Sequence, residues 1–483
     1  MKLKTALALI TTLLLIPLFP YPVQADGPVE SAPSIEIILK ADEHISNHKV
    51  PPPPFPELGV QSVPFTINYN PSTCTGITTP WPAAAQTAFA YAVNIWSVLL
   101  DGPRNIEIDA CWRTDMSKET LGSAGAYMSF KNFISAPYSG YYHNTWYPVT
   151  LANQLANTDL LAGAEIRANF NANQNWYFGT DGNPPSTQYD FVSVVLHEIT
   201  HGLGFSGYMN VDDGTGANEC GGTAGVGCWG GTTGYPRIYD RFTENGSGQA
   251  LLTAFPNFST ALGAQLTGNN LFFNGPFANA ANGGSPPALY APVTWDPGSS
   301  YSHLAEIFNN TPHALMTFSL SNGEAIHHPG SITLGILEDI GWSTTAHPKP
   351  DLTISSLSLN RSSVCVGEQV TIYATESNQG NGGAGSHYLY YYSDNSSSTY
   401  GTEIGSDYLS SLASGSNSYQ SFSFSPTSAG TYYIKAYADA VGQVNESIEN
   451  NNGTYTTLTV NQDTTAPTGS ITINGGATYA TST

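Results

Sequence analysis

The chain has 483 residues, and its 14 lysine and arginine residues against 36 aspartate and glutamate residues give a formal net charge of −22. Nucleic acids and anionic membranes bind basic surfaces, so this balance excludes a nucleic-acid partner. Charged residues are only 10% of the chain, whereas aromatic residues are 12%. Disordered chains are poor in aromatic residues, so we expect a folded protein with a mostly neutral polar surface, in about two to four domains.

The first 25 residues are typical of a secretory signal peptide. Lys2 and Lys4 precede an apolar run that ends at Phe19, and Val23 and Ala25 are the small residues at positions −3 and −1 of a cleavage site. The run is too short to cross roughly 30 Å of hydrocarbon, so no transmembrane segment is expected once the signal is removed. The sequence predicts a secreted, extracellular protein, with attachment to a cell surface left open.

An oxidising compartment favours disulfides among the five cysteines. We expect the pairs Cys74–Cys111 and Cys220–Cys228, which leave Cys365 over. No two cysteines have the C-x-x-C spacing, so a cysteine-based metal site is not expected.

Residues 26–60 are rich in proline and weakly patterned, with four consecutive prolines at 51–54. We interpret them as a linker or a pro-segment. They contain no cysteine, so a thiolate from this segment is not expected to block a metal centre. His44 and His48 lie four residues apart, which suits a metal, but a solvated linker is the favoured interpretation.

Residues 61–345 alternate between strand and helix patterns, which predicts a domain of the α+β class. Strands are expected near residues 63–69, 106–108 and 164–170, and helices at 80–100, 188–203 and 331–340. From Gly204 to Tyr301 the chain is rich in Gly, Asn and Pro and has little periodicity. We expect this part to wrap the surface as a long insertion.

The motif H-E-x-x-H is formed by His197, Glu198 and His201, within the second predicted helix. Two histidines at i and i+4 project from one helical face, so both imidazoles can reach one ion. The carboxylate of Glu198 lies beside them and can take a proton from a water that the metal activates. These residues predict a zinc centre with two histidine ligands and a general base.

A catalytic zinc usually has three protein ligands. Gly204 matches the glycine of the metzincin motif H-E-x-x-H-x-x-G-x-x-H, in which this glycine allows a sharp turn. The third histidine of that motif falls on Gly207 in this chain. The third ligand must therefore come from elsewhere.

Two later segments, Ser299–Leu304 and Ala314–Thr317, carry a Ser-His pair and a Leu-Met pair. Together with H-E-x-x-H and its glycine, they resemble the leishmanolysin (gametolysin-type) branch of the metzincins, which has a long insertion before the third histidine. The resemblance spans residues 197–317 and the helix end at 336–342. It implies a metzincin-like fold, zinc as cofactor, His303 as third ligand, Met316 in a turn beneath the metal, and cleavage of protein or peptide substrates.

Other third ligands remain open on the residues alone. They are His313, His327, His328, Glu306 and Glu324. A core methionine is the ordinary interpretation of Met316, because methionine fills irregular gaps.

After a linker at 346–350, residues 351–461 contain about seven short strands separated by Gly and Asn turns. This pattern predicts an all-β, Ig-like sandwich. The segments Pro350–Thr353, Asn378–Asn381, Gly430–Ile434 and Glu446–Asn452 resemble the bacterial cell-adhesion domain CARDB. The resemblance implies an accessory module for a cell-surface or matrix ligand. Residues 462–483 are expected to be a linker or the start of a further Ig-like module.

Oxygen-bearing side chains in two places suggest calcium, although a solvated loop explains them equally well. They are Asp439, Glu446, Glu449 and Asn451 in the sandwich, and Asp212 and Asp213 in the insertion.

Two main hypotheses follow. The first is a secreted zinc endopeptidase with a C-terminal binding module. The second is a non-catalytic adhesin, which would have no need of Glu198 beside two metal ligands. A zinc hydrolase acting on a non-peptide bond is a third possibility.

Overall fold

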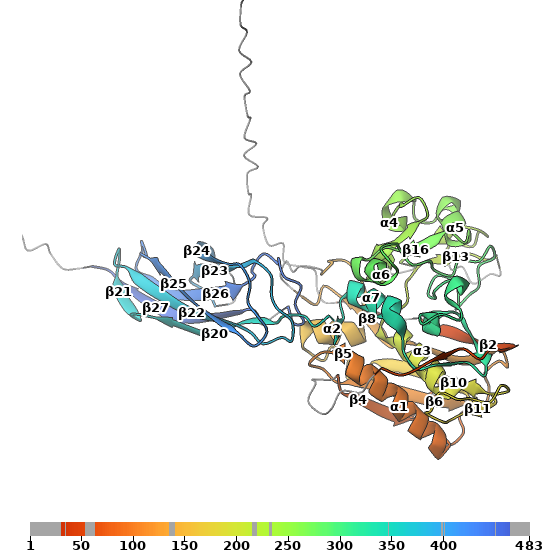
Figure 1. Cartoon of the computed structure of the whole chain (residues 1–483). Helices are drawn as coiled ribbons and strands as arrows, with labels where there is room; N and C mark the ends of the chain where they lie inside the picture. The colour runs from red at the N-terminus through yellow and green to blue at the C-terminus, as the bar shows by residue number, and fades with distance from the viewer. Residues whose placement is uncertain are drawn as a thin grey trace, which may run out of the picture.

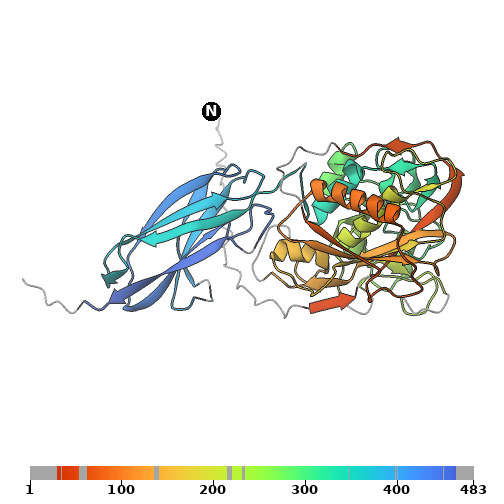
Figure 2. The same cartoon turned by 90° about the horizontal axis from the view of Figure 1, so that it is seen from below.

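The structure is a computed structural model in which an α/β domain is followed by a β-sandwich (Figures 1 and 2). It describes residues 30–33, 35–53, 63–134, 141–214, 220–230, 234–345, 347–397, 399, 401–449 and 451–463. The predicted signal peptide, residues 26–29, 34 and 54–60 of the predicted linker, and residues 464–483 of the predicted tail at 462–483 lie outside the described residues. No helix of the described part is long and apolar enough to span a bilayer.

A six-stranded sheet forms the centre of the first domain. Its strand order is β17-β2-β7-β10-β6-β4. In chain order the strands are β2 (Ile37–Ile45), β4 (Phe65–Tyr69), β6 (Ile106–Arg113), β7 (Thr120–Ala126), β10 (Ile166–Asn171) and β17 (Ser319–Asn322). The strands β4, β6 and β10 are parallel, β7 is antiparallel to β10, and β2 is antiparallel to β7. Strand β17 then runs parallel to β2.

Four helices contribute buried residues to the core of this domain. They are α1 (Ala83–Leu99), α2 (Val149–Ala156), α3 (Phe191–Leu203) and α7 (Gly330–Ile340). Helix α3 packs on α1, β7 and β10, and all its residues are buried. The indole N–H of Trp96 on α1 donates to the carbonyl of Leu196 at 3.1 Å. Helices α1, α3 and α7 confirm the predicted helices within a few residues. Helix α2 was not predicted, because it has only 8 residues and its polar residues Thr150, Asn153 and Gln154 are buried together with the apolar ones, so no exposed polar face marks it.

The expectation that residues 26–60 are a linker is wrong for their described part. Strand β2 lies within the central sheet, β1 (Glu30–Pro33) pairs with β8 (Met128–Lys131), and β3 (Lys49–Val50) pairs with β18 (Ala325–Ile326). Only Ile37 and Leu39 of β2 are buried, so the strand pattern is too short to stand out beside the prolines. The Nε2 atom of His48 hydrogen-bonds the carbonyl oxygen of Thr311, so it is not directed to a metal ion shared with His44.

The insertion after Gly204 is folded, although its apolar residues follow no regular helix or strand spacing. Its elements are only two to seven residues long: β13 (Asn210–Val211), β14 (Gly227–Cys228), η2 (Tyr239–Phe242), β15 (Thr243–Asn245), α4 (Leu251–Ala254), α5 (Thr260–Leu266), β16 (Leu271–Phe273) and α6 (Pro276–Ala281). Elements of this length carry no readable pattern, and buried residues such as Tyr239, Leu262 and Phe273 join them to the main core.

Short two-stranded pairings complete the first domain. They are β11 (Trp176–Tyr177) with β12 (Tyr189–Asp190), and β5 (Leu100–Asp101) with β19 (Ser343–Thr344), while β9 (Tyr147–Pro148) joins β8 and β1 in a three-stranded sheet.

The second domain is the expected β-sandwich. One sheet has the order β20-β22-β25 and the other β21-β27-β26-β23-β24. The strands are β20 (Leu352–Leu359), β21 (Ser363–Cys365), β22 (Val370–Asn378), β23 (His387–Asp394), β24 (Thr402–Leu409), β25 (Asn417–Phe424), β26 (Gly430–Ala438) and β27 (Gly453–Asn461). Its core is a separate apolar cluster.

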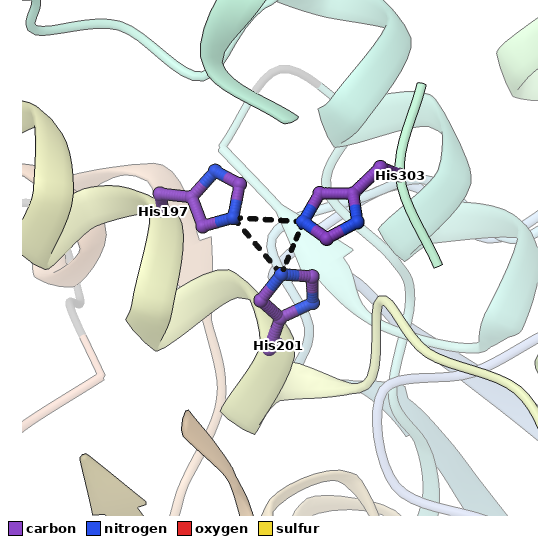
Figure 3. Close-up of side chains that lie close together, drawn as sticks. All are labelled: His197, His201 and His303. Atoms are coloured by element: carbon purple, nitrogen blue, oxygen red, sulfur yellow. Dashed lines mark hydrogen bonds between the residues drawn. The ribbon is translucent and has the colours of Figure 1, made fainter. Parts of the chain in front are cut away.

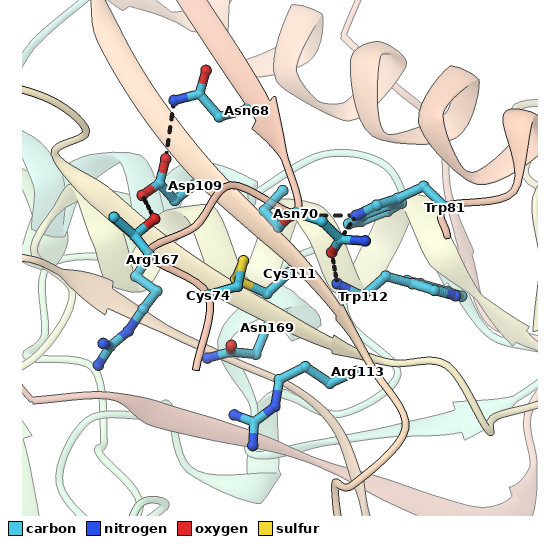
Figure 4. Close-up of a disulfide and its surroundings, with 12 residues drawn as sticks. Asn68, Asn70, Cys74, Trp81, Asp109, Cys111, Trp112, Arg113, Arg167 and Asn169 are labelled. Atoms are coloured by element: carbon cyan, nitrogen blue, oxygen red, sulfur yellow. Dashed lines mark hydrogen bonds between the residues drawn. A yellow bond between two sulfur atoms is a disulfide. The ribbon is translucent and has the colours of Figure 1, made fainter. Parts of the chain in front are cut away.

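The structure contains both expected disulfides. Cys74 pairs with Cys111, with Cα atoms 5.7 Å apart, and Cys220 pairs with Cys228. The first ties the loop after β4 to β6, close to Asn70, whose side-chain oxygen accepts from the indole of Trp81 (Figure 4). Cys365 is free.

Candidate metal centre

Helix α3 is held at both ends by local hydrogen bonds. Asp190 caps its first turn and accepts from the backbone N–H of Ser193 at 2.9 Å. At the other end Gly204 has φ of +116°, and a Cβ there would lie 2.8 Å from Cγ of Pro148. The turn needs glycine on both counts. It directs the carbonyl of Phe205 back to His201, with Nδ1 and O 2.8 Å apart.

His303 joins the two motif histidines from the far end of the insertion. The three Nε2 atoms lie 3.0 Å (His197–His201), 3.2 Å (His197–His303) and 3.3 Å (His201–His303) apart (Figure 3). Among the described residues this is the one group of three or more side chains placed to hold a metal ion.

The hydrogen bonds of the other ring nitrogens determine the tautomers. Each Nδ1 faces a backbone carbonyl: Leu315 at 2.6 Å from His197, Phe205 at 2.8 Å from His201, and Ser299 at 2.7 Å from His303. A carbonyl only accepts, so each Nδ1 is the donor and each Nε2 carries a lone pair. Three converging lone pairs cannot bond one another, and a cation between them is the arrangement that satisfies all three.

The spacing of these nitrogens fits a small tetrahedral ion. Nitrogens bound at about 2.0–2.1 Å to a tetrahedral zinc lie roughly 3.3 Å apart. The carbonyl partners are also what metal-binding histidines usually have, because they orient each ring. The donor set therefore fits zinc.

Burial keeps the three imidazoles neutral. It lowers the pKa of His197 and of His201 well below the ordinary value, with a smaller contribution from the neighbouring histidines. Burial lowers the pKa of His303 to about 4. Neutral imidazole is the form that binds metals.

Glu198 lies beside this group with both carboxylate oxygens lacking a hydrogen-bond partner of standard geometry. Burial, with the charge of Glu36, raises its pKa well above the ordinary value. Strand β7 makes room for the carboxylate with Gly122, where a Cβ would lie 2.7 Å from Oε1 of Glu198. The backbone N–H of Leu39 is the one group that lowers this pKa, and a buried carboxylate with so little compensation is expensive, so its position calls for a function.

The turn η4 (Ala314–Met316) connects two of the ligands. The carbonyl of Leu315 orients His197, while the carbonyl of Met316 accepts from the backbone N–H of Leu304, the residue after His303, at 2.7 Å. Met316 is fully buried. The turn therefore positions His197 and the residue after His303 through its backbone carbonyl groups.

The other candidate ligands are held elsewhere. His327 bonds Asp190 at 2.8 Å, and His328 accepts from the backbone N–H of Gly330 at 2.9 Å. The carboxylate of Glu324 accepts from a backbone N–H of its own turn. His313, and Glu306 in η3 (Glu306–Phe308), are also outside the histidine group.

A buried network that sequence reasoning missed holds the segment before His303. Asp240 accepts from the hydroxyl of Tyr301 at 2.7 Å and from the backbone N–H of Arg237 at 2.7 Å. Tyr301 itself has a φ of +75°, which only the surrounding contacts can maintain. A Cβ at Gly207 would lie 2.1 Å from Oδ1 of Asp240, so the position of the missing motif histidine is filled by this network. Nothing in the local sequence indicates it.

The side chains considered for calcium serve as caps for backbone amides. Asp439 accepts from the N–H groups of Gln443 and Val444, and Glu449 accepts from that of Glu446. Asp212 accepts from Gly214 and Gly222 in the same way. The described residues gather none of these carboxylates into a metal-ligating group of three.

Comparison with known proteins identifies the second domain. The CARDB family model matches residues 349–456, which form a CARDB domain, and the SPBPB7E8-like family model matches residues 110–213. An uncharacterised protein of Schizosaccharomyces pombe is 40% identical over 76 residues, which are 14% of this chain and 13% of that protein. The chain therefore matches only about an eighth of that relative.

Two solved structures are similar to part of the chain. The CARDB domain of the PF1109 protein from Pyrococcus furiosus, solved in complex with di-metal ions, is 27% identical, with 24% of this chain and 96% of that one covered and a TM-score of 0.21. A β-glucosidase from Listeria innocua is 14% identical, with coverage of 25% and 16% and a TM-score of 0.17.

Proposed function

We propose that this chain, which carries a CARDB domain at residues 349–456, is a secreted zinc endopeptidase of the metzincin type. One observation carries the proposal: three Nε2 lone pairs converge within 3.3 Å of one another beside the fully buried carboxylate of Glu198. Three histidines would hold a zinc ion and leave a position open, as in catalytic rather than structural zinc sites. The metzincin assignment draws on the motif resemblance at residues 197–204 and 299–317.

His197, His201 and His303 would hold the zinc ion, which would supply an acidified water and a polarised scissile carbonyl. Glu198 is the general base: it takes the proton of the attacking water and then delivers it to the leaving amine. Gly122 leaves the space in which this carboxylate lies, and the carbonyls of Leu315, Phe205 and Ser299 hold the three rings in orientation.

The CARDB domain supplies the binding module of the proposal. Seven tyrosines share the outer face of its larger sheet, by strand register and partial exposure: Tyr388, Tyr390, Tyr392, Tyr408, Tyr433, Tyr437 and Tyr455. Tyrosine gives a rigid contact surface at low cost in side-chain entropy, which suits recognition. This face also favours the second candidate function, an adhesin, in which binding alone would be the role.

Elemental analysis tests the metal centre first. The purified chain is expected to hold one equivalent of zinc, and His303→Ala is expected to lose most of it, while His313→Ala keeps it. His313 is a matched control because it lies close in sequence but outside the histidine group. Full zinc retention in His303→Ala would remove His303 from the ligands.

Casein hydrolysis then separates peptidase from adhesin. Activity should disappear with a chelator and return with zinc. It is measured before and after release of residues 30–53, because β2 in this segment pairs with β7 opposite Gly122, against which the Glu198 carboxylate lies. A zinc-loaded, released protein without hydrolysis of casein or of a peptide library would contradict the proposal.

A further inference from the structure

The metal centre is closed to any polypeptide. His197 and His201 are 1% exposed, and His303 and Glu198 are fully buried. An endopeptidase must admit an extended chain to these side chains. Some part of the structure therefore occupies the space that a substrate needs.

Strand β2 is the element that covers Glu198. It lies beside α3 and pairs with β7 so that Leu39 is opposite Gly122, the residue against the Glu198 carboxylate. The pairing is irregular at this point, with a register shift between Leu39 and Lys40. The segment that the sequence suggested as a pro-segment thus passes directly over the general base.

The same strand is bonded to the wall that carries His303. The N–H of Ile38 donates to the carbonyl of Gly298 at 3.0 Å, one residue before Ser299, whose carbonyl orients His303. The ammonium group of Lys40 lies 2.6 Å from the carboxylate of Asp296 in the same loop. Further along, the N–H of Lys40 donates to the carbonyl of Phe318 at 3.0 Å.

Strand β2 fills a gap between two sheet edges. In the strand order β17-β2-β7, removing β2 would leave β7 and β17 facing each other with unpaired backbone groups. Such edges bind an extended peptide through main-chain hydrogen bonds, whatever its sequence. The backbone partners of β2 are therefore those that an extended substrate would use.

We propose that residues 30–53 are a built-in inhibitory segment, and that β2 lies in the polypeptide-binding groove in the place of substrate. The proposal rests on the proposed peptidase function and extends it. It assigns an extended polypeptide as the ligand of the groove, antiparallel to β7 and parallel to β17. The chain is latent while β2 is in place and gains access to substrate when the segment is cut and leaves.

The test uses the full, zinc-loaded chain with a site-specific protease sequence inserted between Pro53 and Val63. Two readouts are followed before and after cutting and removal of the segment: the rate at which a chelator strips zinc, and casein hydrolysis. Release is expected to speed stripping at least tenfold and to start hydrolysis. Zinc stoichiometry and circular dichroism check that the released protein is folded.

A synthetic peptide of residues 35–46 is then added back to the released Glu198→Gln protein, which cannot destroy it. The peptide is expected to bind and to restore slow stripping, whereas a Lys40→Pro peptide, which lacks one backbone donor and the ion pair, is not. Equal stripping before and after release, or no effect of the peptide, would overturn the proposal. Fast stripping that the peptide reverses, without hydrolysis, would uphold the inhibitory position and contradict the peptidase function.

An uncut variant covers the case in which release unfolds the protein. Lys40→Ala removes the ion pair with Asp296 but leaves the strand in place, and it should speed zinc stripping several-fold. Lys118→Ala removes an exposed lysine and is the matched control. Identical rates in the two variants would count against β2 as the barrier.

Discussion

At the scale of single residues, Glu198 has the most specific role. Its carboxylate is fully buried and has no hydrogen-bond partner of standard geometry, which a scaffold would not retain. In Glu198→Gln the side chain keeps its size but cannot take a proton. We expect hydrolysis by the released chain to fall by about 10²–10⁴-fold, the usual contribution of a general base, with zinc content unchanged.

The control is Glu324→Gln, which changes another buried carboxylate that accepts from the backbone N–H of Ser321. Its hydrolysis rate should stay near that of the unsubstituted protein. If Glu198→Gln were as active as this control, another group would have to be the base.

Asp240 predicts a pH dependence of stability. Burial raises its pKa to about 6, although Tyr301 and backbone N–H groups bond it. The fold therefore favours the protonated acid, so this contribution to the free energy of unfolding is complete below pH about 4 and is lost as the pH rises through about 6. The loss is at most roughly 3 kcal/mol, at about 1.4 kcal/mol per pKa unit.

Denaturant unfolding between pH 4 and 7 measures this contribution. In Asp240→Asn the group no longer titrates, so the decline over this interval should become shallower by that amount. The variant should also be less stable at low pH, because the amide N–H₂ opposes the N–H donor of Arg237. An unchanged pH profile would show that Asp240 titrates at its ordinary pKa.

At the scale of elements, the end of α3 couples the fold to the metal. Gly204→Ala forces a side chain into φ of +116° and against Pro148, and it displaces the carbonyl that orients His201. We expect a loss of about 1–3 kcal/mol of unfolding free energy together with weaker zinc binding. Chemical denaturation and zinc titration measure the two effects.

Gly163→Ala is the matched control for backbone strain. Gly163 has φ of +98°, but a Cβ there would have no atom within 4 Å. The Gly163→Ala variant should lose only about 1 kcal/mol of unfolding free energy and should keep its zinc affinity. If both variants bound zinc equally well, the turn at Gly204 would not orient His201.

Strand β7 shows why part of the sheet escapes prediction. Its sequence, Thr120–Ala126, is made almost wholly of small residues, which have low strand propensity. Gly122 is small because the Glu198 carboxylate lies against it. The requirement comes from a residue far along the chain, so no local pattern reveals it.

At the scale of the whole molecule, the two domains have separate apolar cores. Among the described residues, polar contacts join the two domains, such as the bond from the Asn381 amide to Asp101 at 3.2 Å and that from the Lys349 ammonium to the Gly341 carbonyl at 2.6 Å. We expect calorimetry to show two transitions.

Zinc should raise only the transition of the first domain, because a ligand stabilises the unit that binds it, by about 2.7 kcal/mol at a hundred times Kd. Addition of a chelator should reverse the shift and leave the CARDB transition unchanged. A single transition that moves as a whole would show that the domains unfold together.

The local sequence by itself determined the features that depend on neighbours along the chain. The i, i+4 pair of His197 and His201 follows from helical geometry, the turn at Gly204 from backbone sterics, and the sandwich from short alternating strands. The tertiary structure alone decided the features that join distant segments. It brings β2 onto β7 some 80 residues later, and it builds the network of Asp240 and Tyr301 that replaces the missing histidine at Gly207. His303 stands between these two cases, since a family resemblance suggested it and only the folding of the insertion brings its ring to the other two. Such long-range contacts depend on shape and burial across the whole domain, and these leave no periodicity in the local sequence.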